Sequence, residues 1–486
     1  MSSVPIQIDH NRSIPIRNQI VEAYSLAIIE CKIKPGSRLP SIRALASRLK
    51  VSPATIAAAY RELVDRALVI ASPRSSFCVS PGGTELGPVY PGNGSARRIY
   101  QLNRIEPDLR IHPVQEFVRM LPVIAAKDLS IGGYEEYRGY RGLREALAGL
   151  DREDGVVTNP ETGMLITSGA QQAITLIARC FGPGAKVAIE DPCFPGARIA
   201  FRNSGADIVP VASTNDGLDS AALKTISVPG AVSVLYCCPT YGNPRGWSWT
   251  EAARVRVLEA AHTGGFMIIE DDYLGDLDYL AEKTRRLAGL AAEFPGVKVV
   301  RIRTFSKCLL PTLLLAGVSA DSAFINKLLA LKVADDIGSS ALLQRGLAQF
   351  IWEGRYEAHL ERVRPRYRAT REALRGALAA QSPKGDALKG SSHARDALRF
   401  DDPPAGLSLL GYLPPDLDPA RFIVECEKDG VIVMSGRDYW FDGANGRHCF
   451  RIGFGALSPE EAVIAVSFFN NALVRAREYS VDHSLL

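Results

Sequence analysis

The sequence predicts an α/β protein with a small helical domain at its N-terminus, a linker and a larger domain built on a mostly parallel sheet. From about residue 116, helical segments alternate with apolar strands, a pattern typical of a parallel sheet covered on both faces. Residues 80 to 110 are rich in Gly, Pro and Ser, as linkers are. Residues 1 to 80 hold 11 Lys/Arg against 5 Asp/Glu, while the rest of the chain holds 46 against 48. The basic charge therefore lies at the front, as expected if only the front meets a polyanion.

Composition excludes several other classes of protein. The 486 residues are 47% hydrophobic and 23% charged, which predicts ordinary globular cores. The longest apolar stretch, near residues 308 to 320, contains Pro311 and is too short to span a bilayer. Nine cysteines without a Cys-x-x-Cys pair argue against a disulfide framework or a zinc site, and His262 and His359 have no partner at metal spacing. We expect a cytoplasmic protein with no membrane segment and no metal site.

The first 80 residues predict three helices and a hairpin. Pro15 opens an amphipathic helix that ends near Gly36. Ser41 is a suitable N-cap for a short second helix, and Ser52 for a third that has Pro53 at its first position. Two short helices joined by a tight turn predict a helix-turn-helix, and residues 68–70 and 77–79 predict a β-hairpin wing.

This segment resembles the winged helix-turn-helix of the GntR family, through Lys34-Pro35-Gly36, Leu39-Pro40-Ser41 and Val51-Ser52. The resemblance implies binding to a double-stranded DNA operator. The DNA contacts it implies are Arg38, Ser41, Arg43, Ser52, Thr55 and Arg74. Pro53 and Ala54 stand where the family usually has an arginine and a polar residue, so specificity would depend on Arg43, Thr55 and DNA shape. The alternative is a basic helical bundle that binds another protein.

In the larger domain, polar side chains follow the predicted strands at the sheet edge where α/β proteins place their chemistry. Lys307 follows the strand at 299–303, and a lysine among apolar neighbours is shifted towards the neutral amine that attacks carbonyls. Lys307 is therefore a candidate for an aldimine with pyridoxal phosphate. Asp271 and Tyr273 follow the strand at 266–270, and Asn243 follows the strand at 232–236. They could supply the carboxylate for the cofactor's ring nitrogen and the donors for its phenolate oxygen.

Together these motifs resemble fold-type I pyridoxal-phosphate enzymes of the aminotransferase class in their MocR-type regulator form, over roughly residues 110 to 475. The resemblance implies a mostly parallel sheet, a smaller C-terminal lobe and a homodimer. It also implies further roles for single residues: Ser168, Gly169 and Ala170 at the phosphate, Thr304 beside the lysine, Phe194 stacked on the ring, Tyr134 reaching the neighbouring subunit's phosphate, and Arg451 gripping an effector carboxylate.

The phosphate end departs from that family. Leu314 stands where relatives have an arginine that clamps the phosphate, and Ala170 replaces a common threonine. Affinity should fall unless another cation substitutes, and Arg301 or Arg303 could do so.

The function predicted from the sequence is a pyridoxal-phosphate-dependent transcriptional regulator that senses the cofactor, or an amino-acid or amine effector, through an aldimine at Lys307. We expect residues 12–80 to bind DNA, 81–110 to be a linker and 111–486 to bind cofactor and effector and to dimerise. Little turnover is expected of the aminotransferase-like domain. Two alternatives remain: an active aminotransferase with a DNA-binding appendage, and a regulator whose effector domain has lost the cofactor.

Overall fold

The computed structural model describes residues 15–29, 33, 36–65, 68–72, 76–79, 99–280, 284–381 and 397–483. These form two compact units. The first comprises the described residues up to 100, 415–434 and those from 468, and the second comprises those in 101–414 and 435–467. Within the described ranges, no helix is both long enough and apolar enough to cross a membrane.

The N-terminal part has the predicted three helices and hairpin: α1 (Ile16–Ile29), α2 (Ile42–Leu49), α3 (Pro53–Asp65), β1 (Val69–Ser72) and β2 (Ser76–Val79). The Ser41 hydroxyl accepts a hydrogen bond from the Ala44 amide (3.2 Å), and the Ser52 hydroxyl accepts one from the Thr55 amide (3.1 Å). Both predicted N-caps are thus confirmed. The core of this part is made by Ile20, Val21, Tyr24, Leu45, Ile56, Tyr60, Leu63, Val69 and Val79.

The hairpin is a two-stranded antiparallel sheet in which Val69 faces Val79. Arg38 makes an additional bridge to Cys78, and the Leu39 amide donates to the Phe77 carbonyl (2.8 Å), so the chain before α2 lies along β2. The predicted wing is confirmed. Lys34, Pro35, Arg74 and linker residues 80–98 lie outside the described residues.

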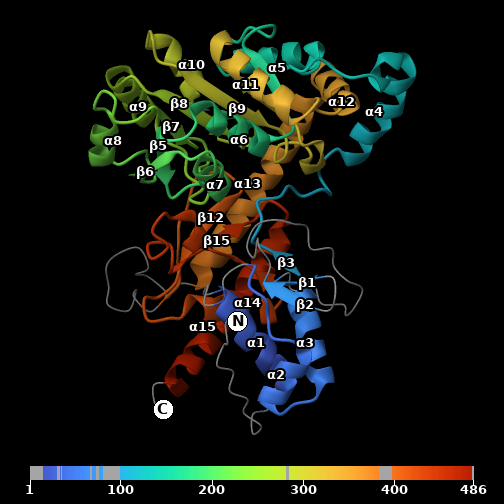
Figure 1. Cartoon of the computed structure of the whole chain (residues 1–486), viewed down its shortest axis with the longest axis vertical. Coiled ribbons are helices and arrows are strands. Elements are labelled where there is room, and N and C mark those ends of the chain that lie inside the picture. Colours follow the sequence, from blue (N-terminus) through green and yellow to red (C-terminus); the bar gives the residue numbers. More distant parts are fainter. Residues whose placement is uncertain are drawn as a thin grey trace. The chain divides into compact units, whose positions relative to one another are not determined.

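A seven-stranded sheet forms the centre of the second unit (Figure 1). Its strands, in the spatial order β4-β10-β9-β8-β7-β5-β6, are β4 (Met164–Thr167), β10 (Ala316–Ser319), β9 (Val299–Thr304), β8 (Met267–Asp272), β7 (Val234–Cys237), β5 (Lys186–Asp191) and β6 (Asp207–Ala212). The strands from β9 to β6 are parallel, and β10 is antiparallel to both of its neighbours. The predicted mostly parallel sheet is confirmed.

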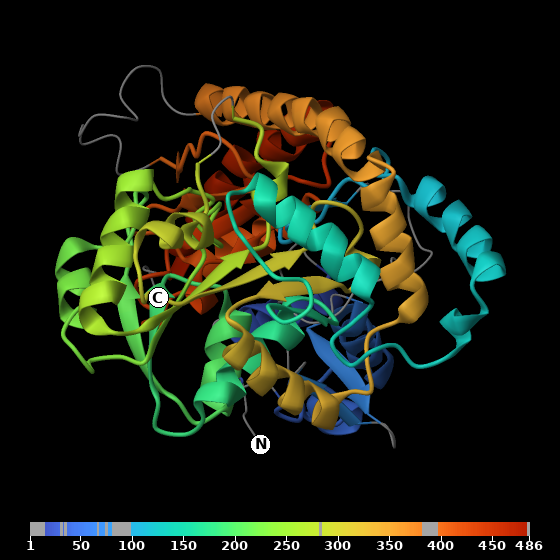
Figure 2. The same cartoon turned by 90° about the horizontal axis from the view of Figure 1, so that it is seen from above.

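Helices cover both faces of this sheet (Figures 1 and 2). One face packs on α6 (Ala170–Phe181), α7 (Pro195–Asn203) and α11 (Ser322–Asp335). The other packs on α8 (Ser220–Ile226), α9 (Glu251–Gly264) and α10 (Leu287–Leu290). Because side chains alternate along a strand, Val300 and Ile302 of β9 face the α6 side. Arg301 and Arg303 therefore face the opposite side, a point that matters for the site.

The second unit also contains a small antiparallel sheet in which β11 (Arg399–Phe400) pairs with β12 (Ser408–Tyr412) and β12 with β15 (Cys449–Gly453). Leu410 faces Arg451 in the last pair. A helix of 27 residues, α13 (Arg355–Gln381), precedes this sheet in the chain. The other helices and strands of the two units are β3 (Tyr100–Gln101), α4 (Val114–Lys127), α5 (Arg141–Glu153), α12 (Ala341–Trp352), α14 (Pro419–Lys428), β13 (Val431–Ile432), β14 (Met434–Ser435) and α15 (Pro459–His483), with short 3-10 helices at 129–132, 275–277, 291–293, 311–313 and 437–439; α14 and β13 lie in the first unit.

Candidate functional site

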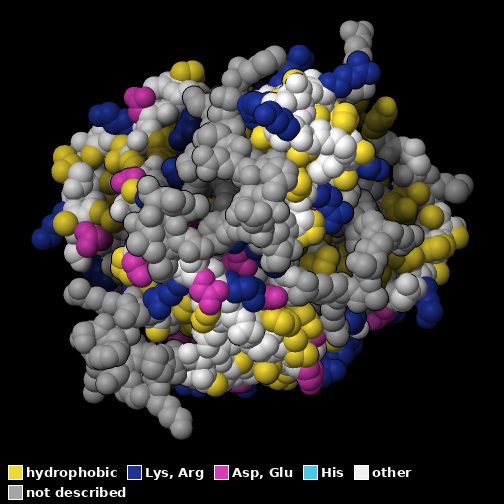
Figure 3. Space-filling model, turned by 90° about the horizontal axis from the view of Figure 1, so that it is seen from below, with side chains coloured by type: hydrophobic (Ala, Val, Ile, Leu, Met, Phe, Trp, Pro, Cys, Tyr) yellow, Lys and Arg dark blue, Asp and Glu magenta, His cyan; other side chains and the backbone are white. Residues whose placement is uncertain are grey.

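The candidate DNA-binding surface lies on the helix-turn-helix. Arg38 and Arg43 are exposed, as are Ser41 and Ser52, while Thr55 is half-buried. The Ser52 hydroxyl also lies 2.8 Å from the Thr55 hydroxyl, so these two side chains hold the start of α3 as well as facing outwards. Figure 3 views the molecule from below, with Lys and Arg side chains in dark blue on the described surface. The arrangement gives exposed cations beside a capped helix start, which suits contact with a phosphate backbone.

A second site is formed in the other unit, where β7, β8 and β9 end. Asp271 is 4% exposed, and one of its carboxylate oxygens, Oδ2, accepts a hydrogen bond from the Tyr236 hydroxyl (2.5 Å). The other oxygen, Oδ1, is buried and has no hydrogen-bond partner among the described residues. Burial raises the pKa of Asp271 to about 6, while the Tyr236 hydrogen bond opposes that rise. A cationic N–H donor placed against Oδ1 would satisfy this acceptor and stabilise its charge.

Lys307 lies in the turn that follows β9. The Ser306 amide donates to the Thr304 hydroxyl (3.3 Å), which fixes the start of this turn. Lys307 is half-buried, and no hydrogen bond or ion pair of its ammonium occurs with any residue that the structure describes. Burial is the main cause that lowers the pKa of Lys307, with Arg451 and Arg104 adding to it and Glu106 opposing it. The lysine is thus shifted towards its neutral, nucleophilic form.

Arg451 projects from β15 and is 5% exposed. Its Nη1 donates to Asn243 Oδ1 (3.0 Å), its Nη2 donates to the Asn103 carbonyl, and its guanidinium lies 5.2 Å from the Tyr439 ring centroid. Its Nε is buried without a hydrogen-bond partner among the described residues. Since Asn243 Oδ1 already accepts from Arg451, the Asn243 amide N–H group is the part that remains to donate to an anionic oxygen.

Tyr273 directs its hydroxyl proton to the Tyr241 carbonyl (2.7 Å). Burial raises its pKa well above the ordinary value, so it stays protonated. The predicted donation from Tyr273 to a cofactor oxygen would require it to exchange this bond.

The phosphate end of the predicted site lies at the start of α6. Gly169 precedes this helix with φ 86°, and the Ser168 hydroxyl lies 2.9 Å from that of Ser339. A Cβ on Gly169 would lie 3.9 Å from the Leu314 Cα, so Leu314 does come next to this helix start. Leu314 is 61% exposed and adopts φ 47°. The first turn of α6 therefore has backbone N–H groups and Ala170, and beside it lies Leu314, where the resemblance implies an arginine.

The suggestion that Arg301 or Arg303 replaces the missing cation is wrong. Both lie on the face of the sheet opposite Val300 and Ile302, because side chains alternate along β9, and α6 packs on the face of those two residues. Both arginines are also engaged: Arg301 with Asp151 (3.0 Å) and Asp272 (2.6 Å), and Arg303 with Asp276 (3.2 Å).

Phe194 and Tyr134 are the remaining predicted cofactor residues. Phe194 is the half-buried N-cap of α7, and a Cβ on Gly196 would lie 2.5 Å from its ring, so the ring folds back over that glycine. Tyr134 is 86% exposed.

Sequence reasoning missed Tyr236 and the segment 102–106. The Gly453 amide donates to the Leu102 carbonyl (2.6 Å), and a Cβ on Gly453 would lie only 1.9 Å from the Arg104 carbonyl oxygen. Arg104 pairs with Glu106 (3.1 Å), and both charges act on Lys307. The glycine after Ile452 was a visible signal for close backbone approach, but not for which segment approaches. The alternation of side chains along β7 was the signal that could have placed Tyr236 on the face of the sheet towards α6.

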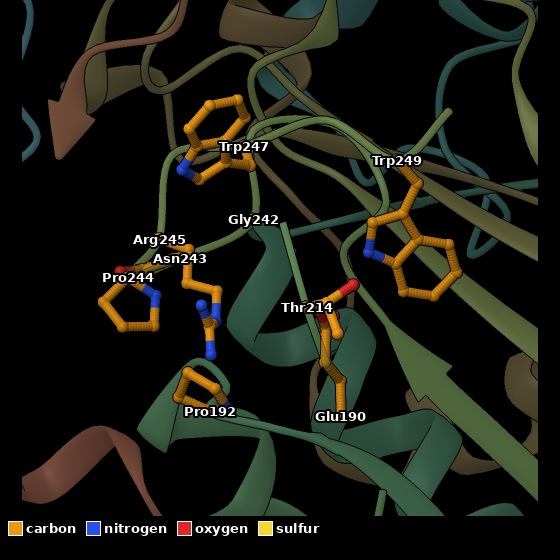
Figure 4. A pocket seen from close by; sticks show the side chains of 9 residues that line it. All are labelled: Glu190, Pro192, Thr214, Gly242, Asn243, Pro244, Arg245, Trp247 and Trp249. Atoms are coloured by element: carbon orange, nitrogen blue, oxygen red, sulfur yellow. The ribbon is translucent and has the colours of Figure 1, made fainter. Parts of the chain in front are cut away.

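Asn243 is one of the residues that line a small pocket (Figure 4). It encloses about 230 Å³ of empty space, part of it open solvent, and its lining residues are Glu190, Pro192, Thr214, Gly242, Asn243, Pro244, Arg245, Trp247 and Trp249. Figure 4 shows the two indoles on different sides of it. Burial raises the pKa of Glu190 to about 7, and its carboxylate accepts from the Cys238 amide (3.1 Å). Lys307 and Asp271 are not among its lining residues. In the described part of the chain no cluster of His, Cys, Asp or Glu could hold a metal ion.

Comparison with known proteins covers both parts of the chain. Residues 107–469 match the family described as aminotransferase class I and II, and residues 16–79 match bacterial regulatory proteins of the gntR family. The HTH-type transcriptional regulator TauR of Rhodobacter capsulatus is 26% identical over 474 residues, which are 91% of this chain and 93% of TauR. The uncharacterized HTH-type transcriptional regulator YcxD of Bacillus subtilis is 28% identical over 431 residues, 88% of this chain and 92% of YcxD.

Among solved structures, LysN, the α-aminoadipate aminotransferase of Thermus thermophilus in complex with N-(5'-phosphopyridoxyl)-L-leucine, superposes with a TM-score of 0.69 at 27% identity, covering 78% of this chain and 93% of LysN. An archaeal alanine:glyoxylate aminotransferase has a TM-score of 0.70 at 26% identity, covering 78% of this chain and 91% of its own.

The chain therefore belongs to the aminotransferase class I and II family, and it carries a gntR-family winged helix-turn-helix in front of that domain. This is the MocR-type architecture of the HTH-type transcriptional regulators that it resembles along most of its length. The fold implies pyridoxal phosphate as the cofactor. Asp271 Oδ1, which no described residue meets, and the Lys307 amine with its lowered pKa are chemically suited to it.

Proposed function

We propose that this regulator binds an operator through residues 12–80, and that pyridoxal phosphate and a small amino acid or amine bind in the domain at 111–486 and set its affinity for DNA. Residues 81–110 would link the two. A homodimer and a cytoplasmic location complete the proposal. The observation that carries it is the buried Asp271 Oδ1, without a partner among the described residues, in the same unit as a lysine whose pKa is lowered by burial.

Each residue has a defined task in this proposal. When bound, pyridoxal phosphate supplies an aldehyde that condenses with amines and a ring that withdraws electrons. Lys307 would present the neutral amine, Asp271 Oδ1 would accept from the ring nitrogen, and the Asn243 N–H group would donate to the ring oxygen. Arg451 Nε is the remaining donor for an effector carboxylate. Ser168, Gly169 and Ala170 offer the start of α6 to the phosphate, and Thr304 fixes the lysine turn.

Phe194 would cover the ring, and Tyr134 would reach the phosphate of the second subunit, which is why the proposal includes a homodimer. Sedimentation of the full chain tests that element directly. A monomeric wild type, or a Tyr134→Phe variant that binds the cofactor as tightly as the wild type, would contradict the assignment of Tyr134.

The first experiment is the visible absorbance of the full chain titrated with pyridoxal phosphate, beside Lys307→Ala. The matched control is Lys327→Ala, which removes an exposed lysine from α11. We expect a visible band in the wild type and in Lys327→Ala that is absent from Lys307→Ala. No band in the wild type would contradict the cofactor assignment and would favour an effector domain that binds another ligand.

The effector is tested in the same spectrum with a panel of amino acids and amines. Amino acids should perturb the band in the wild type, and Arg451→Met should require a higher concentration of any effector that carries a carboxylate. Consumption of a keto acid with each turnover would instead support an active aminotransferase.

The DNA-binding assignment is tested by a gel shift against the DNA upstream of the protein's own gene. Arg43→Ala should abolish the shift at physiological salt, because it removes an exposed cation from the helix-turn-helix. Arg17→Ala is the matched control, since it also removes one arginine from this part but from a side chain that pairs with Glu62 (3.3 Å). Equal binding by the two variants would contradict the proposed recognition surface.

A further inference from the structure

The turn that carries Lys307 has two backbone carbonyls that are buried in the protein interior. The Leu309 and Leu310 amides both donate to the Phe305 carbonyl (2.9 and 3.1 Å), which closes the turn. Cys308 and Leu309 are 1% and 0% exposed, and in the part of the chain that the structure describes no backbone amide donates to their carbonyls. Buried carbonyls need a donor, so side chains must supply it.

Two histidines supply these donors. His359 Nε2 lies 3.0 Å from the Cys308 carbonyl, and His112 Nδ1 lies 2.5 Å from the Leu309 carbonyl. Because a carbonyl can only accept, His359 Nε2 and His112 Nδ1 must each carry a proton. His112 Nε2 then accepts from the Tyr367 hydroxyl at 2.6 Å. One donor and one acceptor on His112 is the pattern of a neutral imidazole.

The two rings come from separate parts of the second unit and pack on each other, with centroids 4.7 Å apart. His359 belongs to α13, which also places Tyr356 against Phe305 at 5.5 Å. His112 precedes α4, on the stretch that leads in from the linker. His359 and His112 are 0% and 6% exposed, and burial lowers their pKa values to about 3 and about 4. Both therefore stay neutral near pH 7, as is required for His112 Nε2 to accept from the Tyr367 hydroxyl and for His359 Nδ1 to accept from Arg362 Nη2 (3.5 Å).

We propose that His112 and His359 are positioning residues that hold the Lys307 amine in place through the carbonyls of the two residues that follow it. This rests on the proposed role of Lys307 in binding pyridoxal phosphate. Neither imidazole is hydrogen-bonded to the lysine, so their effect is on its orientation and environment. Two donors from two elements fix consecutive peptide planes, and the orientation of the Lys307 Cα is set by the same turn.

The alternative is that the histidines only fill space. The variants His359→Phe and His112→Phe separate these possibilities, since phenylalanine keeps an aromatic ring and removes the donor. His359→Gln and His112→Asn keep an N–H donor. His262→Ala is the control, because His262 is exposed on α9.

Two measurements are made on the full chain. The first is titration with pyridoxal phosphate, followed by visible absorbance. The second is trace labelling of Lys307 with acetic anhydride in the cofactor-free protein across pH, read by mass spectrometry. For the phenylalanine variants we expect a dissociation constant raised about tenfold, the change that about 1.4 kcal/mol gives. We also expect the labelling midpoint of Lys307 to move by about half a pH unit or more. The Gln and Asn variants should lie near the wild type.

The proposal is overturned if the phenylalanine variants bind the cofactor and label at Lys307 as His262→Ala does, even if they unfold at a lower temperature. If a phenylalanine variant does not fold, the comparison of His359→Gln with His359→Ala decides, since only the former keeps a donor. Absence of a visible band in the wild type would count against the cofactor assignment alone, because labelling still shows whether the imidazoles control Lys307.

Discussion

A buried carboxylate on one face of the large sheet has an oxygen without a partner in the described part of the chain, and a buried carboxylate on the other face is paired with arginines. Adjacent residues of β8 carry the two groups. On the face towards α6, Asp271 has one oxygen without a partner among the described residues, and its pKa is raised to about 6, chiefly by burial. On the other face, Asp272 pairs with Arg301 (2.6 Å) and Arg286 (3.0 Å). Burial alone would raise the pKa of Asp272, but these guanidinium groups hold it well below its usual range.

The difference separates two uses of a buried carboxylate. A carboxylate that is fully paired holds the fold together and has no capacity left for a ligand. A carboxylate with a free oxygen leaves the empty domain less stable and is available to a cation that arrives with a ligand. Asp271 and Asp272 should therefore respond oppositely to mutation.

The largest effect is expected on the paired face. Arg301→Met removes a cation from Asp272 and Asp151 in a site that is 1% exposed, so we expect a loss of about 3 to 5 kcal/mol in the free energy of unfolding. Urea unfolding of the cofactor-free protein measures it. Asp271→Asn is the comparison and should lose no stability at pH 7, because it removes no ion pair and replaces a carboxylate that burial disfavours. Similar losses in both variants would remove the distinction between the faces.

The second effect is on cofactor affinity, for which Asp271 and not the paired face is expected to matter. Asp271→Asn replaces the free acceptor by a neutral amide, so affinity for pyridoxal phosphate should fall about a hundredfold, which corresponds to about 2.7 kcal/mol. An absorbance titration measures this. A variant at Tyr236, Tyr236→Phe, keeps the free oxygen and should lose much less. Unchanged affinity in Asp271→Asn would show that Oδ1 does not meet the ring.

The pH dependence of stability gives a third test. The pKa of Asp271 in the folded protein, about 6, lies above its ordinary value of 3.8. Its contribution to stability is thus fully present below pH 3.8 and is lost as the pH rises through 6. Between about pH 4 and pH 7 the cofactor-free wild type should lose about 2 kcal/mol relative to Asp271→Asn. With cofactor bound, the cationic ring nitrogen should remove this loss, and a loss that persists in the bound form would contradict the pairing.

The smallest expected effect comes from adding a charge at the start of α6. Leu314→Arg places a guanidinium beside this helix start, so affinity for pyridoxal phosphate should rise about tenfold. Leu314→Gln is the uncharged control. Pyridoxal without its phosphate should bind both variants alike, and a gain that does not depend on the phosphate would mean that residue 314 acts on something else.

Much of this protein could be predicted from sequence because the signals are local. Their places before helical patterns predict Ser41 and Ser52 as caps, and the ends of β7, β8 and β9 indicate Asn243, Asp271 and Lys307. The side of the sheet that Arg301 and Arg303 face is also a local signal, since alternation along β9 places them opposite Val300 and Ile302.

Local signals in the sequence are enough to predict the two-part architecture, the succession of strands along the chain and the residues at the strand ends, because caps, turns and periodicity act within a few residues. The tertiary structure alone decided which of these residues are paired. Asp271 meets Tyr236 from 35 residues away, Arg301 meets Asp151 from 150 away, and His112 meets Leu309 from 197 away. Such contacts depend on how the chain packs, and packing also decides which buried groups are left available to a ligand.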